Sequence, residues 1–568
     1  MFIRRLIVER YRALERLEWD PPARINCLIG PGDVGKSTVL SAIERLLDPG
    51  ASTTASEFDY YRRRVEQGFQ ITAIIGDLNE DFLASLRIPP LHGWKSGELK
   101  VLPDEESAEP VLVARVSGSP DLDVTHVLVT PGEAEDLPFT PGMRRRLLLS
   151  RITTGSRAAS ELRLGRGTLL DKHLGGSELQ RQLRSAAAAA LAALQLPQEA
   201  EEAVARLREV FKHAGLPENL ALGLITPHGW SLLGLLGLVQ GDQPGEAIPL
   251  AYAGAGTRQL ATFRLAAALM GASPIVLMDE PEVGLEPYRQ RKLIAEIRAA
   301  VGDCGQAFLT THSPAILEAL EPGEISRLAP SQNPVALEGN KVGRVQREAP
   351  DALLARLPVL CEGDTEAGFL SVALDRFAEQ DGLGSIDALG IRLVARRGQP
   401  QILDEADAML QAGISLGLFV DKEDKHAGRR GALAANPRCA YGSWASVRNV
   451  EEAVATWLPW EHMSSVVGLA AELRGRPEQE LLQQVGEAIG CPGSATLDEL
   501  HRTYPEQRVR EDLSKAMQSK NNPWFKTFEG GRALAAKLLD LGLPSPMEEA
   551  LRRFWTRVLE VAGWRSKT

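Results

Sequence analysis

Short apolar runs bounded by Gly, Pro and Asp alternate with longer amphipathic stretches along most of the 568-residue chain. In the N-terminal part this pattern predicts a helix over residues 36–47 and strands over residues 2–10, 24–29, 69–78 and 110–116. The alternation returns later, with helices predicted over 258–270 and 287–301 and strands over 274–279 and 306–311. Strands separated by helices of this length are typical of α/β folds with parallel sheets.

The pattern changes between residues 140 and 215, where Ala, Leu, Arg and Glu dominate and apolar positions recur every three or four residues. It predicts helices over residues 143–152, 179–196 and 201–216. This helical insert is either an arm or dimer contact within an α/β domain, or a helical lobe packed on the sheet.

A second α/β series follows residues 322–352, a short turn-rich stretch that we interpret as a linker. Strands are predicted over 357–361, 391–395 and 416–421, and helices over 363–379 and 400–412. The chain from about residue 445 is expected to be mainly helical. We therefore expect two domains, over residues 1–345 and 353–568.

Composition limits the classes of protein that remain. A net charge of −11 excludes a histone-like basic protein, and 44% hydrophobic with 24% charged residues is typical of globular chains. No run of about 18 apolar residues occurs, so we expect no membrane span and a soluble, cytoplasmic protein. The five cysteines are widely scattered, which disfavours both a disulfide framework and a zinc site.

A phosphate-binding loop is predicted at residues 30–37, where GPGDVGKS fits GxxxxGK[ST] between a strand and a helix. Backbone N–H groups of such a loop surround phosphates, while the lysine reaches the β- and γ-phosphates and the serine coordinates Mg²⁺. The residues expected to bind ATP are Gly30, Gly32, Gly35, Lys36, Ser37 and Thr38.

Partner motifs for this loop lie far downstream. An apolar strand ends in Asp279 and Glu280, and we expect Asp279 to hold Mg²⁺ through water and Glu280 to polarise the attacking water. His312 follows the next strand, where a sensor of the γ-phosphate would sit. Gly254 and Gly256 open a helix whose backbone N–H groups suit a γ-phosphate presented by another subunit.

Carboxylates follow two strands of the second series. Glu362 and Glu366 come after the first strand at a spacing that places both on one helix face, and Asp421, Glu423 and Asp424 follow the strand LGLFV. Ligands gather at the carboxyl ends of parallel strands, so these acids are expected to converge. Clustered carboxylate oxygens favour Mg²⁺ or Mn²⁺, and two such ions can catalyse phosphodiester cleavage.

The order of the nucleotide motifs resembles that of ABC-type ATPases of the RecF and SMC kind. The resemblance implies that ATP is sandwiched between two heads, in a homodimer or higher homo-oligomer. The sequence departs from that pattern in two places. AGAGTRQ replaces the usual LSGGQ. Residues 281–287 lack the Asp that usually occurs in the loop after the strand-end acids, here Asp279 and Glu280.

The carboxylate pattern resembles the Toprim domain of topoisomerases, primases and OLD (overcoming lysogenization defect) nucleases. An ABC head followed by Toprim resembles the OLD family over nearly the whole chain, and the paired glutamates resemble its class 2 members. Glu423 then replaces the second Asp of the DxD motif, with Asp424 as an alternative. The resemblance also implies that Glu451 binds metal and that Lys526, with Lys537 as a rival, stabilises transition-state charge.

These patterns together predict an ATP-hydrolysing, Mg²⁺- or Mn²⁺-dependent DNA endonuclease or nickase. The alternative is a DNA clamp or repair scaffold of the RecF type, in which ATP controls binding without cleavage. The OLD resemblance implies phage defence, in some members beside a superfamily 1 helicase. RNA as the substrate stays open. Residues 60–64 (YYRRR) mix aromatic and basic side chains in a way that suits DNA, but we interpret them as a solvated loop. The turn at residues 426–430 (HAGRR) either contacts phosphate or, like most such turns, is merely solvated.

Overall fold

In the computed structural model, the described residues are all but 79, 85, 87–88, 102–107, 133–134, 148, 153–157, 164–167, 175–181, 183–197, 199–237, 241–247, 270–273, 338, 397, 423, 445, 490–495, 520 and 565–568. They fall into two compact units. Unit 1 comprises residues 1–26 and 37–311, and unit 2 comprises residues 27–36 and 312–568. The helices predicted over 179–196 and 201–216 lie almost entirely outside the described residues.

Unit 1 contains an antiparallel sheet with the order β2-β1-β4-β7-β5-β6, to which β8 and β9 add beside β7. Its strands are β1 (Phe2–Tyr11), β2 (Leu14–Trp19), β4 (Phe69–Gly76), β5 (Leu91–Lys95), β6 (Glu98–Lys100), β7 (Glu109–Gly118), β8 (Val124–Leu128) and β9 (Leu137–Pro138). Apolar residues such as Ile3, Leu6 and Val8 are fully buried, while the charged residues between them stay partly exposed. The alternation therefore sets which face of β1 packs inward.

A parallel ladder of β10 (Leu149–Ile152), β13 (Ile275–Asp279) and β14 (Gln306–Thr310) forms the second part of unit 1. The apolar residues of β13 are buried, as expected for a strand covered on both faces. The helices of this unit are α1 (Lys36–Leu47), α2 (Glu80–Ala84), α3 (Pro141–Arg145), α4 (Ala158–Glu161), α5 (Leu169–Leu174), α9 (Ala255–Leu269) and α10 (Pro287–Val301). A short antiparallel pair, β11 (Val239–Gln240) and β12 (Ile248–Pro249), completes it.

The helix predicted over residues 143–152 is wrong in its second half. The chain is helical only to Arg145, and Leu149–Ile152 is a strand that pairs in parallel with β13. The leucine-rich run favours a helix locally, but pairing with an already buried strand satisfies its backbone and covers its apolar side chains.

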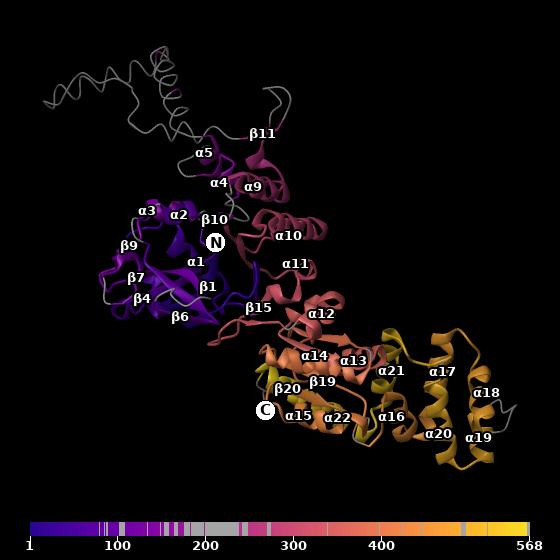
Figure 1. Cartoon of the computed structure of the whole chain (residues 1–568). Helices are drawn as coiled ribbons and strands as arrows, with labels where there is room; N and C mark the ends of the chain where they lie inside the picture. The colour runs from indigo at the N-terminus through magenta and orange to yellow at the C-terminus, as the bar shows by residue number, and fades with distance from the viewer. Residues whose placement is uncertain are drawn as a thin grey trace, which may run out of the picture. The chain divides into compact units, whose positions relative to one another are not determined.

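Unit 2 is built around a parallel sheet with the order β18-β17-β19-β20. These strands are β17 (Leu357–Cys361), β18 (Ile391–Ala395), β19 (Leu416–Phe419) and β20 (Cys439–Gly442). The helices that alternate with these strands are α13 (Asp364–Gln380), α14 (Gln399–Gln411) and α15 (Ala427–Ala435). The later ones are α16 (Val450–Trp457), α17 (Trp460–Arg474), α18 (Glu478–Ile489), α19 (Leu497–Thr503), α20 (Glu506–Met517), α21 (Phe528–Leu541) and α22 (Ser545–Ala562). The helical C-terminal region is therefore confirmed, with α15 and α22 next to β20 (Figure 1).

The interpretation of residues 322–352 as a plain linker is wrong. This stretch contains β15 (Ile325–Arg327) and β16 (Val335–Ala336). β15 pairs in parallel with the last residues of β3 (Ile25–Ile29) and antiparallel with β16. The stretch also contains α12 (Gly339–Glu348), and α11 (Pro314–Ala319) precedes it. Three-residue strands carry almost no periodic signal of their own and depend on partners distant in sequence.

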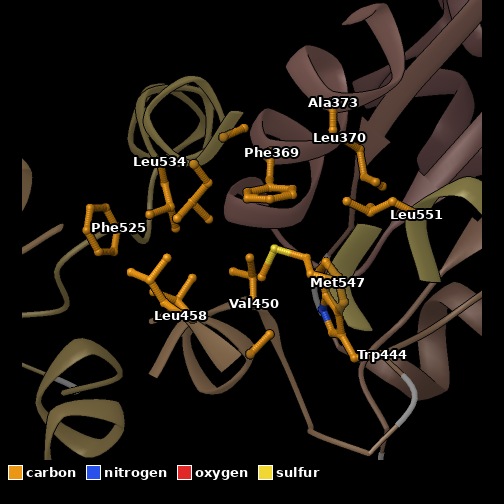
Figure 2. Close-up of a cluster of buried hydrophobic side chains, with 14 of the residues drawn as sticks. Phe369, Leu370, Ala373, Trp444, Val450, Leu458, Phe525, Leu534, Met547 and Leu551 are labelled. Atoms are coloured by element: carbon orange, nitrogen blue, oxygen red, sulfur yellow. The ribbon is translucent and has the colours of Figure 1, made fainter. Parts of the chain in front are cut away.

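The core of unit 2 joins the parallel sheet to the later helices. Figure 2 shows Phe369 of α13, Val450 of α16, Leu534 of α21 and Met547 of α22 in one apolar cluster with Trp444. The ring of Trp444 meets Phe369 edge-on, with centroids 6.0 Å apart. Segments separated by up to 178 positions in the sequence are thus fixed to one another by a shared apolar cluster. In the part of the chain that the structure describes, no helix is both long and apolar enough to cross a membrane.

Candidate functional site

The glycines of the phosphate-loop motif adopt conformations that other residues disfavour. Gly30 has φ 149° and Gly35 has φ 97°, and a Cβ on Gly30 would lie 2.2 Å from the carbonyl oxygen of Leu328. Lys36 is buried at the first position of α1, where its Nζ donates to the carbonyl oxygens of Gly30 (3.0 Å) and Pro31 (2.8 Å). The loop therefore wraps back over the lysine amine, while Gly32 is exposed and Thr38 is half-buried.

Ser37 and the acidic motif of β13 lie together within unit 1. The Ser37 Oγ donates to Asp279 Oδ1 at 3.0 Å, and the hydroxyl of Thr310 donates to the same oxygen. Glu280 is exposed with φ 49°, and its N–H is held by the Thr310 hydroxyl at 3.1 Å. Two residues that the sequence assigns to one Mg²⁺ ion, 242 positions apart, are thus in direct contact.

His312 and the two glycines at the start of α9, Gly254 just before the helix and Gly256 within it, also lie among the described residues. His312 is exposed directly after the buried Thr311, whose hydroxyl donates to Glu282 Oε2 at 2.9 Å. A Cβ on Gly256 would lie 2.6 Å from the carbonyl oxygen of Gly284, whereas Gly254 faces open space. The start of α9 therefore packs tightly against the loop that follows Glu280, while Gly254, just before the helix, stays accessible.

In unit 2, Glu362 and Asp421 lie side by side where β17 and β19 end. The two strands pair in parallel with Cys361 opposite Phe419. The backbone N–H of Asp421 donates to Glu362 Oε2 at 3.0 Å, and the N–H of Glu362 reaches the carbonyl oxygen of Phe419 at 3.3 Å. Acids 59 positions apart in the sequence thus meet at one edge of the sheet.

Gln399, which belongs to none of the predicted motifs, links these two strand ends. Its Nε2 donates to Glu362 Oε2 at 3.0 Å and to the carbonyl oxygen of Asp421 at 2.6 Å. Its Oε1 accepts from Nη1 of Arg430 at 3.1 Å. Arg430 is buried in α15, so a merely solvated turn over residues 426–430 is wrong for this residue. The sequence signal for Gln399 was its position as a polar residue at the start of α14, directly after the parallel strand β18.

Glu366 and Glu451 are buried acids that influence each other electrostatically. The pKa of Glu366 is raised to about 7, first by burial and then by the negative charges of Glu451 and Glu362, against the lowering effect of Lys526. Burial also raises the pKa of Glu451, and Lys526 again acts in the opposite direction. Glu362, Glu366, Glu451 and Lys526 therefore share one electrostatic environment.

Local packing explains how these charged residues are brought together. Glu366, Glu451 and Lys526 each stand one to three positions from a core residue of Figure 2, namely Phe369, Val450 and Phe525. The Thr365 hydroxyl donates to the carbonyl oxygen of Phe525 at 3.1 Å. A Cβ on Gly531 would lie 2.2 Å from the carbonyl oxygen of Thr365, so α21 packs backbone to backbone against the start of α13.

Not every predicted ligand can be placed. Glu423 lies outside the described residues, and Asp424 opens a short turn before α15 without a described side chain. Lys526 is exposed beside the acids, whereas its rival Lys537 lies in the third turn of α21. Within the described residues no three His, Cys, Asp or Glu side chains stand close enough together to hold a metal ion. The described acids are instead held partly by Gln399 and by backbone N–H groups.

A cavity of about 1210 Å³ in unit 2 reaches one of these acids, Glu362. It is lined by Glu362, Gly363 and Asp364, by the edge strand β18 and by Phe528 and Arg532 of α21. Glu362 is therefore reachable along one side of α13.

One region of the chain matches a model of a known protein family. Residues 77–318 match the family model described as "AAA domain, putative AbiEii toxin, Type IV TA system". No curated protein matches the chain significantly.

Solved SMC head structures also match. The head domain bound to the C-terminal winged-helix domain of ScpA is 14% identical with a TM-score of 0.36, covering 61% of this chain and 100% of that one. The Pyrococcus furiosus head with an extended coiled coil, bound to the C-terminal domain of ScpA, is 13% identical with a TM-score of 0.36, covering 61% and 99%. The Thermotoga maritima head is 13% identical with a TM-score of 0.29, covering 60% and 100%.

The family match spans the acidic motif of β13, the start of α9 and His312, and the phosphate-loop motif precedes it. The chain therefore contains an ATPase domain of the AAA type.

Proposed function

We propose that the chain is an ATP-hydrolysing DNA endonuclease or nickase, acting in phage defence or DNA processing, whose cleavage site is a two-metal Toprim site in unit 2. The observation that carries this proposal is the direct contact between Glu362 and Asp421 at the ends of two parallel strands. A binding protein without catalytic chemistry has no evident use for Glu366 and Glu451 buried beside this pair.

The carboxylate chemistry of the donors, rather than their spacing among the described residues, suits a hard divalent cation. Carboxylate oxygens are preferred by Mg²⁺ and Mn²⁺, and a cation would offset the burial and mutual repulsion that raise the pKa of Glu366 and Glu451. The residues that would hold metal are Glu362, Glu366, Asp421, Glu451 and either Glu423 or Asp424. When bound, such ions activate a water and stabilise the leaving oxygen of a phosphodiester.

The protein's own side chains contribute orientation and charge. Gln399 orients Glu362 relative to Asp421, and Arg430 in turn fixes Gln399. Lys526 is exposed beside the acids, where it would attract the phosphate and stabilise charge that develops during cleavage. DNA would therefore be held mainly through its phosphates, so its affinity should fall steeply with salt.

Nucleotide chemistry is assigned to the motifs around Lys36 and Asp279. Backbone N–H groups from Gly30 to Gly35, with Lys36, would bind the phosphates of ATP, while Ser37 and Asp279 would hold its Mg²⁺. Glu280 would polarise the attacking water and His312 would sense the γ-phosphate. Gly254 and Gly256 would act on the nucleotide of a second copy, so a homodimer or larger homo-oligomer is the proposed active form.

Incubating supercoiled plasmid with the purified protein and Mg²⁺ or Mn²⁺, with and without ATP, tests the proposal. We expect nicked or linear products that depend on the metal and disappear with a chelator. Intact plasmid under every condition, together with retained ATP turnover, would instead support the ATP-controlled DNA clamp. A superfamily 1 helicase as partner would be tested by adding it to the same assay.

A further inference from the structure

Strained arginines gather at one surface of unit 1. Among the described residues ten non-glycine residues have positive φ, and four of them are Arg10 (54°), Arg12 (49°), Arg62 (53°) and Arg63 (59°). These four lie in two segments that an isolated antiparallel bridge between Tyr11 and Tyr60 joins. The left-handed conformation disfavours residues with a Cβ, and such strain concentrates at functional sites.

The same surface presents aromatic rings beside the arginines. Three short 3₁₀ turns follow one another here, Glu57–Asp59, Tyr61–Arg63 and Val65–Gln67. The Arg63 guanidinium lies 4.4 Å from the ring centroid of Phe58, and Arg62 lies 5.1 Å from that of Tyr61. Phe58 remains 59% exposed, so much of its ring is open to a further stacking partner.

The charge of this surface is opposite to that of the chain. Residues 10–12 and 57–67 carry five arginines against three carboxylates, a net charge of +2 in a chain of −11. One of those carboxylates, Asp59, is buried and ion-paired with Arg12 at 2.8 Å. Arg62, Arg63 and Arg64 are exposed, so their charge faces solvent.

The surface is also attached to the helix that begins at the phosphate loop. The Tyr11 hydroxyl lies 3.2 Å from Ser41 Oγ, and Nη1 of Arg12 donates to the same oxygen at 2.7 Å. Ser41 lies in α1, little more than one turn beyond Lys36. A shift of α1 on nucleotide binding would therefore displace Tyr11 and Arg12 at this surface.

We propose that Phe58, Tyr61, Arg62, Arg63 and Arg64 form a platform that binds single-stranded nucleic acid. The exposed ring of Phe58 and the half-buried ring of Tyr61 would accept unpaired bases by stacking, and the neighbouring guanidinium groups would bind the phosphates between them. Paired bases in a duplex offer no free faces to these rings, which favours a single strand. The inference concerns binding by unit 1 and is independent of cleavage in unit 2.

Fluorescence anisotropy with a labelled 20-nucleotide oligo(dT), between 50 and 200 mM salt, tests this platform. Phe58→Ala should weaken binding roughly fivefold to 150-fold, the range for losing one stacked base. The double variant Arg62→Gly, Arg63→Gly keeps the left-handed backbone accessible while removing both charges. It should bind at least about tenfold more weakly and lower the salt slope by about 1.4.

Tyr288→Ala is the matched control, because Tyr288 is 60% exposed with Arg289 5.7 Å from its ring centroid. It should bind the oligonucleotide like the unaltered chain, and ATP turnover of every variant reports correct folding. Unchanged affinity in both platform variants would overturn the proposal. Equal affinity for a duplex of the same length, unaffected by Phe58→Ala, would overturn the single-strand assignment.

Discussion

The two candidate sites are built in opposite ways. The nucleotide motif is one contiguous octapeptide whose function rests on backbone N–H groups, and the Ser37 and Asp279 side chains meet in an exposed hydrogen bond. The carboxylate site draws on four segments between residues 362 and 526, and two of its acids are buried. A loop of backbone donors is ready to bind an anion, whereas buried acids need a cation or a proton to be stable.

This difference predicts that the two activities can be separated by single substitutions. The largest effect is expected for Asp421→Ala, which removes a carboxylate at the end of β19. Plasmid cleavage should fall by roughly 10³-fold, comparable to the loss of a group that stabilises transition-state charge, while ATP turnover stays unchanged. Cleavage and ATP hydrolysis are measured on the same preparation.

Asp404→Ala is a suitable control for Asp421→Ala. Asp404 is an exposed acid of the same unit, and among the described residues it forms an ion pair with Arg429. Its loss should leave cleavage intact. If Asp421→Ala still nicks plasmid at the original rate with Mg²⁺ or Mn²⁺, the metal assignment is wrong.

Lys36→Ala is expected to produce the reciprocal result. Removing the amine that reaches the phosphates should lower ATP turnover by about 10²- to 10³-fold. Cleavage that proceeds without ATP should persist. Lys292→Ala, on the exposed face of α10, controls for the loss of a lysine charge. An unchanged rate of ATP hydrolysis in Lys36→Ala would reject the phosphate-loop assignment.

The two sites also differ in how much of each could be predicted from the sequence. The phosphate loop and the strand ending in Asp279 were identifiable because their chemistry lies in short contiguous motifs. Glu362 and Asp421 were identifiable because parallel strands end at a common edge, and the structure brings them into contact. The roles of these residues stay predictions, as do the domain boundaries.

Other features could not be read from the sequence because their determinants are distant or weakly patterned. Gln399 acts through hydrogen bonds with Glu362, Asp421 and Arg430, none of which is a sequence neighbour. Residues 149–152 have helical composition but form a strand because β13 offers a buried partner. The strand at residues 325–327 is too short to show any periodicity and depends on β3.

The raised pKa of Glu366 predicts an unusual pH dependence for the metal-free protein. Its folded-state pKa of about 7 lies above the ordinary 4.5, so the folded chain binds the extra proton between these values. Stability should therefore be lost as pH rises from 4.5 to 7, by on the order of 2–3 kcal/mol. Glu366→Gln should flatten this dependence in thermal unfolding.

Adding a divalent cation to the thermal-unfolding measurement tests whether Glu366 also binds metal. Mg²⁺ should raise the melting temperature at pH 8 in the unaltered chain more than in Glu366→Gln, because a cation binds only the charged acid. A pH profile that is the same in both proteins, with an equal response to Mg²⁺, would show that Glu366 is neither perturbed nor a ligand.

The smallest effect concerns the packing that assembles the carboxylate site. Gly531→Ala would place a Cβ 2.2 Å from the Thr365 carbonyl oxygen, so α21 must shift away from α13. We expect a loss of about 1–2 kcal/mol in the free energy of unfolding, measured by urea denaturation, since overpacking forces the backbone to move. Cleavage should also weaken, because Thr365 precedes Glu366 and bonds to the residue before Lys526.

Gly428→Ala is the matched control for Gly531→Ala. Gly428 lies in α15, where an added Cβ meets nothing within 4 Å. Alanine favours a helix over glycine by up to about 1 kcal/mol, so this variant should be slightly more stable. If both substitutions stabilise the protein equally, the close approach of α21 to α13 does not constrain the fold. The carboxylate site would then not depend on that contact for its geometry.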